Sequence, residues 1–218
     1  MTFVSTLLAG ALFGLALAAP PGPMNAIIAE ESVLRGWTAG FKTGLGAMSA
    51  DVLFFVLALA GAVTFIRRLP TVRDLLFLVG GLLMLYFAVG AVRGASGQLR
   101  SSSRTESRGF SKAFVLSLSN PYQILFWLTA GIGLLTPGTI DVLSYASEAF
   151  AGLVVVETGS VALVVGLFVG VFGWIVGFPA ALVAAESKIE AFAPVVAYGS
   201  AVVLAGFGLY FLGSVLLL

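Results

Sequence analysis

Long runs of apolar residues without a charged side chain divide the chain, and short polar segments separate these runs. Only one of the long apolar stretches, residues 38–66, contains charges inside it, namely Lys42 and Asp51. A helix needs about 20 predominantly apolar residues to span a bilayer. The pattern therefore predicts six membrane-spanning helices, near residues 3–29, 38–66, 72–93, 112–135, 158–184 and 194–217.

The composition supports a bilayer as the solvent. Of the 218 residues, 60% are hydrophobic and only 10% are charged, whereas a soluble domain has about 25% charged residues. Such a chain has too few polar groups to cover its own surface in water. We therefore predict an all-α integral membrane protein, multi-pass in the cytoplasmic membrane, with the lipid bilayer as its surroundings. The net charge of +1 gives no indication of nucleic-acid binding.

The chain contains neither cysteine nor histidine. Disulfides, thiolate metal ligands and dithiol chemistry are therefore excluded, and the commonest proton shuttle and metal ligand is missing. An intramembrane enzyme would need a nucleophile with a base, or a metal cluster, and no such constellation occurs. We predict no enzymatic activity, no metal site and no cofactor.

The first apolar run resembles a signal peptide at Ala16–Ala19, but it lacks a basic start and a proline follows the small residues. We therefore expect a retained membrane segment.

Charges in the connections predict the orientation. The connection 93–112 carries five basic residues and one acidic residue, while 136–157 carries three acidic residues and no basic one. The positive-inside rule places the first connection in the cytoplasm and the second outside. Six spans then leave both termini outside, although Arg67 and Arg68 would also lie outside, against the rule. If residues 3–29 form a re-entrant hairpin instead, the N-terminus lies inside.

Prolines interrupt two of the predicted spans. Pro20-Pro21-Gly22-Pro23 lies in the first and Ser119-Asn120-Pro121 in the fourth. Proline removes a backbone donor and clashes with the preceding turn, and in hydrocarbon the freed carbonyls need protein or a wet cavity as a partner. We therefore predict that helices one and four are broken. Paired breaks of this kind are typical of the binding site of a secondary transporter.

The two halves of the chain share an order of features. Each has a break, a glycine-rich span and a span with Leu-Tyr-Phe; Tyr86 and Tyr210 lie 124 positions apart, as do Gly46 and Gly170. Three spans per half is an odd number, so the second half must enter the membrane inverted. We predict two inverted three-helix repeats, 1–93 and 112–218, joined by a basic cytoplasmic loop, 94–111. The alternative is chance recurrence of common membrane residues.

Small residues recur on single helix faces. Gly40, Gly44, Ala47 and Asp51 follow at spacings of four, three and four, and the next glycine-rich span has the strip Gly166, Gly170, Gly173 and Gly177. Small residues allow helices to pack closely in lipid. We expect both strips to be faces on which helices pack, and the strip in the second span to end in the carboxylate of Asp51.

Asp51 is the strongest single candidate for function. A charge at the bilayer centre costs at least about 2.5 kcal/mol on insertion scales, so it normally faces the protein interior. The helices that restart after the breaks have unpaired N–H groups, which suit a carboxylate. We predict that the breaks hold the carboxylate of an amino acid, and that Asp51 holds its ammonium or shuttles a coupling proton. Asn25, Asn120 and Gln123 either bind the substrate or cap the restarted helices.

Two segments outside the predicted spans carry weaker expectations. Glu30, Glu31 and Arg35 follow the first break, and we expect them to be solvated at the cytoplasmic surface. Residues 142–156 are moderately apolar, and we expect a short interfacial helix there.

The chain resembles the lysine-exporter (LysE/RhtB) family of amino-acid efflux carriers over nearly its whole length. The motifs that carry the resemblance are Pro21-Gly22-Pro23-Met24-Asn25, Arg35-Gly36-Trp37-Thr38-Ala39-Gly40, Gly46-Ala47-Met48-Ser49-Ala50-Asp51, Gly109-Phe110 and Ser119-Asn120-Pro121-Tyr122-Gln123-Ile124-Leu125-Phe126-Trp127. Two residues depart from the family pattern. Ala50 replaces a usual glycine, and Tyr122 stands where a lysine often follows Asn-Pro.

The resemblance implies a secondary transporter that exports amino acids or related small metabolites, driven by the proton or cation gradient. Its central residues would match Asp51, Pro21, Gly22, Pro23, Asn120 and Pro121; our substrate-binding set adds Asn25 and Gln123. The alternative is a cation or heavy-metal efflux protein of a related fold. The absence of Cys and His disfavours soft metals, and one carboxylate is too few for a hard cation. The sequence leaves a homo-oligomer open.

Overall fold

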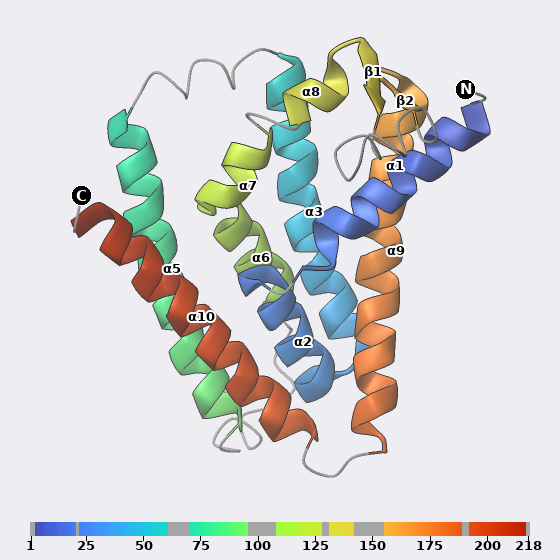
Figure 1. Cartoon of the computed structure of the whole chain (residues 1–218). Coiled ribbons are helices and arrows are strands. Elements are labelled where there is room, and N and C mark those ends of the chain that lie inside the picture. Colours follow the sequence, from blue (N-terminus) through green and yellow to red (C-terminus); the bar gives the residue numbers. More distant parts are fainter. Residues whose placement is uncertain are drawn as a thin grey trace.

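The structure is a computed structural model, and it describes residues 3–20, 22–60, 70–95, 108–127, 131–141, 155–188 and 192–216. Helices dominate this part of the chain (Figure 1). The nine described helices are α1 (Phe3–Ala18), α2 (Pro23–Arg35), α3 (Trp37–Leu59), α5 (Pro70–Ala95), α6 (Gly109–Leu118), α7 (Pro121–Phe126), α8 (Ile132–Leu135), α9 (Val161–Glu186) and α10 (Phe192–Leu216).

Four of these helices are long and apolar enough to cross a membrane. They cover Trp37–Leu59, Asp74–Arg93, Val161–Glu186 and Phe192–Val215. Helices α1 and α2, bent by 83° at their junction, make a fifth crossing if they form one span. The chain is therefore an all-α, multi-pass membrane protein, as predicted. Six spans are not reached in the described residues, and the inverted repeat stays a prediction.

The expected fourth span, 112–135, is divided into short pieces. Helix α6 ends at Leu118, α7 begins at Pro121, and α8 covers only Ile132–Leu135. Asn120 separates α6 from α7 in an extended conformation, and Pro121 occupies the first turn of α7. The physical reason is the one expected for a proline, because its ring is compatible only with the start of a helix.

The first segment runs from one end of the molecule to the other. Figure 1 shows the N-terminus near the strands and the end of α2 at the opposite end of the molecule. Between the two helices, Gly22 is extended and Pro23 opens α2. The bend of 83° between α1 and α2 fits both a broken span and a re-entrant loop, so both alternatives of the sequence analysis stand.

Glycines set the contact between α1 and α9. A Cβ atom added at Gly10 or Gly14 would run into the backbone of α9, and one at Gly166 or Gly170 into the backbone of α1. The two backbones therefore approach as closely as only glycine permits. The expected strip does not continue, because a Cβ added at Gly173 or Gly177 meets nothing within 4 Å. The close contact of α1 and α9 therefore ends before Gly173.

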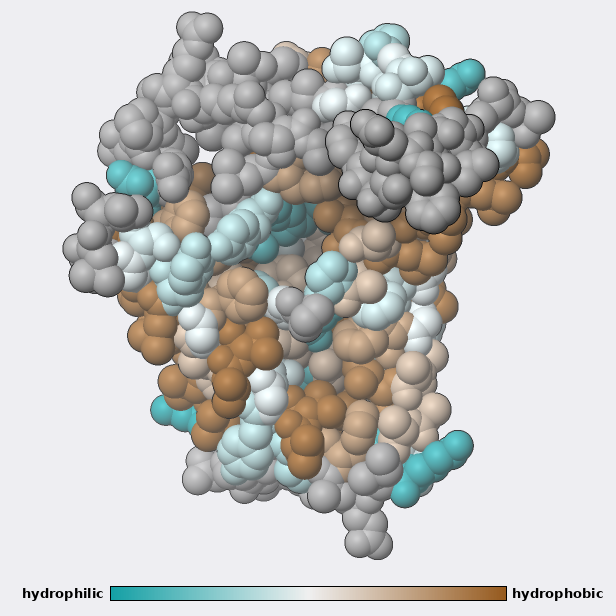
Figure 2. Space-filling view, viewed as in Figure 1, coloured by the Kyte–Doolittle hydropathy of each residue, from teal (hydrophilic) through white to brown (hydrophobic). Residues whose placement is uncertain are grey.

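Helices α5 and α10 form a second closely packed pair (Figure 1). Gly81 and Gly208 face each other at their contact, and the surrounding core contains Phe77, Met84 and Phe211. Large apolar side chains on the outer faces of both helices are exposed. Figure 2 shows hydrophobic side chains over much of the flanks, as expected for surfaces that contact lipid.

A small antiparallel sheet replaces part of the expected interfacial helix at 142–156. Strand β1 (Gly138–Asp141) pairs with β2 (Val155–Thr158), with Gly138 opposite Thr158. Residues 142–154 lie outside the described residues, as does most of the basic loop expected at 94–111. The β-branched Val155, Val156 and Thr158 favour the strand.

Candidate functional site

A cavity of about 420 Å³ lies where the two helix breaks meet. Helices α1, α2, α3, α7, α9 and α10 all contribute to its wall. Figure 2 shows the molecule hollowed near the middle of the face turned to the viewer. The volume lies within the range of small-molecule sites, roughly 300–1,000 Å³.

Asn25 closes the first break. Its side-chain amide donates to the carbonyls of Ala18, at 2.6 Å, and Pro20, at 2.9 Å. These carbonyls lie at and beyond the end of α1, where the helix no longer supplies them with donors. The Asn25 oxygen in turn accepts from the indole N–H of Trp174 on α9, at 3.0 Å. Asn25 therefore satisfies the break, which is the capping alternative of the sequence analysis, while it also lines the cavity.

Asn120 organises the second break in a similar way. Its side-chain oxygen accepts from the backbone N–H of Tyr122 at 3.1 Å, so it caps the start of α7. The hydroxyl of Ser119 donates to the carbonyls of Val115 and Leu116 at the end of α6. Polar groups at both helix ends are thereby paired inside the protein, as hydrocarbon surroundings require.

Asp51 lies on α3 and reaches the cavity opposite these breaks. Its Oδ1 accepts from the amide of Gln123 at 2.7 Å and from the indole N–H of Trp127 at 2.9 Å. Both donors are neutral, and within the described part of the chain no cation pairs with Asp51 and no donor reaches Oδ2. The carboxylate is thus held in a fixed orientation with one oxygen left for a ligand.

Tyr122, the residue after the Asn120-Pro121 break, lies at the contact of α7 with α10. Its ring stacks on Tyr210 of α10, with 6.4 Å between centroids and 12° between planes. Tyr122 also lines the cavity. A pair of stacked aromatic rings therefore stands beside the second break, one of them in the cavity wall.

The structure brings most of the predicted site residues to this one cavity. Of the predicted set, the residues that line it are Asp51, Gly22, Pro23, Asn25, Asn120 and Gln123. Pro21 lies outside the described residues, and Pro121 is described only as the first residue of α7. Their part in binding stays a prediction.

Sequence reasoning did not select the aromatic and sulfur-containing side chains of the wall. Trp127 holds Asp51, and Trp174 holds Asn25. Met48 lines the cavity from α3; it precedes Asp51 by three positions, a spacing that places both on one helix face. For Trp174, the sequence shows only an aromatic residue directly after Gly173 of the glycine strip, and this alone does not indicate a role in the site.

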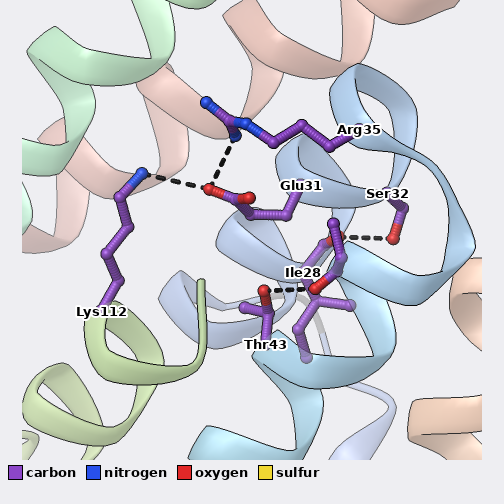
Figure 3. Close-up of polar contacts among 7 residues, drawn as sticks. Ile28, Glu31, Ser32, Arg35, Thr43 and Lys112 are labelled. Atoms are coloured by element: carbon purple, nitrogen blue, oxygen red, sulfur yellow. Dashed lines mark hydrogen bonds and ion pairs between the residues drawn. The ribbon is translucent and has the colours of Figure 1, made fainter. Parts of the chain in front are cut away.

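Glu30 and Glu31 are not solvated, contrary to the sequence expectation. They are 4% and 1% exposed, because α2 packs against α3, α6, α9 and α10. Glu31 forms ion pairs with Arg35, at 2.8 Å, and with Lys112 of α6, at 3.1 Å (Figure 3).

In the described residues, no group of three or more His, Cys, Asp or Glu side chains is placed to hold a metal ion.

Comparison with known proteins points to one family. The family model described as LysE type translocator matches residues 15–214. The chain is 35% identical, over 54% of its length, to the putative amino acid efflux protein YcgF of Bacillus subtilis, and covers 57% of it. It is 29% identical, over 57% of its length, to the leucine efflux protein of Salmonella typhimurium, and covers 59% of that. These matches span less than two thirds of each relative. No solved structure matches the chain.

Proposed function

The chain belongs to the LysE type translocator family, and from this premise we propose that it exports an amino acid or a related small metabolite across the cytoplasmic membrane. The observation that carries the proposal is the Asp51 carboxylate in the cavity wall, oriented by Gln123 and Trp127 and without a cationic partner in the described residues. A buried carboxylate is costly unless it is paired. A substrate ammonium supplies the missing partner when the site is filled.

The start of α2 is suited to the other end of an amino acid. Pro23 opens this 13-residue helix, and Gly22, Pro23 and Met24 all line the cavity. The first backbone N–H groups of a helix have no partner within it and carry a partial positive charge. We infer that a substrate carboxylate binds here, on backbone N–H groups, since Tyr122 takes the place of a cation.

The rest of the wall favours an apolar side chain on the substrate. Met24, Met48, Phe126, Trp174 and Phe207 make up much of it. Asp51 is the only charged residue among the described lining residues, so neither a second carboxylate for a basic side chain nor a cation for an acidic one is present there. A relative named as a leucine efflux protein points in the same direction.

The inverted repeat is part of this proposal. In support, α1 of the first half packs on α9 of the second, α6 of the second half packs on α3 of the first, and α5 packs on α10. This exchange of partners is what a two-fold axis in the membrane plane produces. We further propose that the proton or cation gradient drives export. The alternative, cation efflux, is disfavoured by a wall with a single carboxylate.

The test is efflux from cells loaded with single labelled amino acids. We expect the wild-type chain to export leucine or methionine and the variant Asp51→Asn to lose this export. The control is Asp74→Asn, which changes an exposed carboxylate near the start of α5 and should retain export. A dependence of export on external pH would support proton coupling. Normal export by Asp51→Asn would remove Asp51 from the mechanism, and absence of amino-acid export by the wild type would refute the proposed function.

A further inference from the structure

A second polar cluster lies one helical turn beyond the cavity and has no role in the site described above. Ile28 lines the cavity, and Glu31 follows three positions later on α2, on the same face. The Glu31 carboxylate accepts from Arg35 of its own helix at 2.8 Å and from Lys112 of α6 at 3.1 Å. Figure 3 shows both long side chains converging on this carboxylate from different helices.

The layer of the molecule at the level of this cluster is tightly packed where α2, α3 and α9 meet. A Cβ added at Gly40 of α3 would meet the Ser32 hydroxyl of α2 and the ring of Pro179 of α9. One turn nearer the cavity, Gly44 packs in the same way against Ile175. Helices α2, α3 and α9 are therefore in direct contact at this depth.

The polar groups in this layer are satisfied within their own helices. The Ser32 hydroxyl donates to the carbonyl of Ile28 at 2.6 Å, and that of Thr43 to the carbonyl of Ala39 at 2.8 Å (Figure 3). Both residues are buried. Neither hydroxyl needs a water molecule as a partner, so the contact between α2 and α3 at this level can be dry.

Lys112 joins two parts of the chain that are otherwise far apart in sequence. Glu31 belongs to α2 in the first half, and Lys112 to α6 in the second, 81 positions later. The Lys112 ammonium also lies 5.9 Å from the centre of the Phe87 ring of α5. A single cation thus connects three helices at the level of this packed layer.

We propose that the Glu31–Lys112 ion pair is a gate that keeps the cavity closed toward the end of the molecule where α5 ends and α6 begins, and that it breaks when the cavity opens to that end. An ion pair between a buried carboxylate and a partly exposed ammonium suits this role. Burial costs the Glu31 carboxylate most of its hydration and the Lys112 ammonium part of it, and their attraction offsets this cost only while the geometry is intact. When the helices separate and water enters, each ion regains its hydration, so the two states differ little in free energy.

This inference rests on the proposed function for its direction. The basic connection 93–112 assigns this end to the cytoplasm by the positive-inside rule. An exported amino acid would then enter from this end. The pair would separate to admit the amino acid and re-form before release on the other side.

The test uses the absence of cysteine from the chain. Ala47→Cys places one small thiol in the cavity wall, and its reaction with a membrane-impermeant maleimide is followed in right-side-out and inside-out vesicles. Ser187→Cys, exposed just after α9, identifies the vesicles in which the gated end faces the reagent. We expect slow labelling of the cavity thiol from that face. Lys112→Met should raise the rate at least about tenfold.

Two further variants separate the ion pair from a general loss of packing or charge. Lys112→Arg retains a cation and should keep the slow rate, and Lys188→Met, an exposed lysine at the same end, should leave it unchanged. An unchanged rate in folded Lys112→Met, or an equal rise in Lys188→Met, would overturn the proposal. If Lys112→Met does not insert, Glu31→Gln is measured against the same criteria. The assay contains no amino acid, so its failure leaves the Asp51 result intact.

Discussion

Trp174 of α9 donates its indole N–H to the side-chain oxygen of Asn25 at 3.0 Å, so a helix of the second half supports the helix break of the first. The amide of Asn25 is already used by two carbonyls at that break. The bond from Trp174 therefore holds Asn25 in the orientation in which its amide faces those carbonyls. Without the bond from Trp174, the Asn25 side chain is free to turn away from the carbonyls of Ala18 and Pro20, which then lose their donors.

Trp174→Phe should test this support. An aromatic ring is retained, but the half-buried Asn25 oxygen loses its donor, and the net contribution of such a hydrogen bond is about 0.5–1.5 kcal/mol. We expect a lower midpoint of thermal unfolding in detergent and weaker export. Tyr198→Phe, on an exposed side chain of α10, is the control and should match the wild type. An unchanged midpoint in Trp174→Phe would show that the bond contributes nothing to the break.

Gln123→Leu should reveal how much the orientation of Asp51 matters. Gln123 donates to the carboxylate oxygen at 2.7 Å, and Trp127 remains as the other donor at 2.9 Å. A hydrogen bond to a charged group contributes about 1.5–3 kcal/mol, so the substrate concentration for half-maximal export should rise roughly tenfold or more. The measurement is export rate against internal substrate concentration. The control is Ser49→Ala, which removes a hydroxyl that donates to the Leu45 carbonyl of its own helix. It should leave the substrate concentration for half-maximal export unchanged.

Gly170→Val should disrupt the crossing of α1 and α9. The added side chain would meet the backbone of α1 near Ala11 and Leu15. Forced overpacking of this kind costs about 1–3 kcal/mol or more. We expect a clear loss of thermal stability in detergent. Gly173→Val lies on the same helix in open space and provides a matched control. Equal stability of the two variants would contradict the close contact of the backbones.

Much of the architecture could be predicted from the order of apolar and polar residues. Charges are costly in lipid, so four of the predicted apolar runs form helices long enough to cross a membrane, and Pro23 and Pro121 stand at helix starts. The same rules pointed to Asp51, because a carboxylate inside a span must face protein or a cavity. These conclusions depend on local physics, which a sequence carries directly.

Other features needed the tertiary structure, because they depend on which segments meet. Glu31 follows a helix break and has a charged neighbour, so its sequence context suggests a solvated surface. Only the packing of α3, α6, α9 and α10 around α2 buries it and brings Lys112 to it. Likewise, Gly166 and Gly173 belong to one strip in the sequence, but α1 covers only the first of them. Local patterns determine which face of a helix is small or polar, whereas contacts between distant segments decide what covers it.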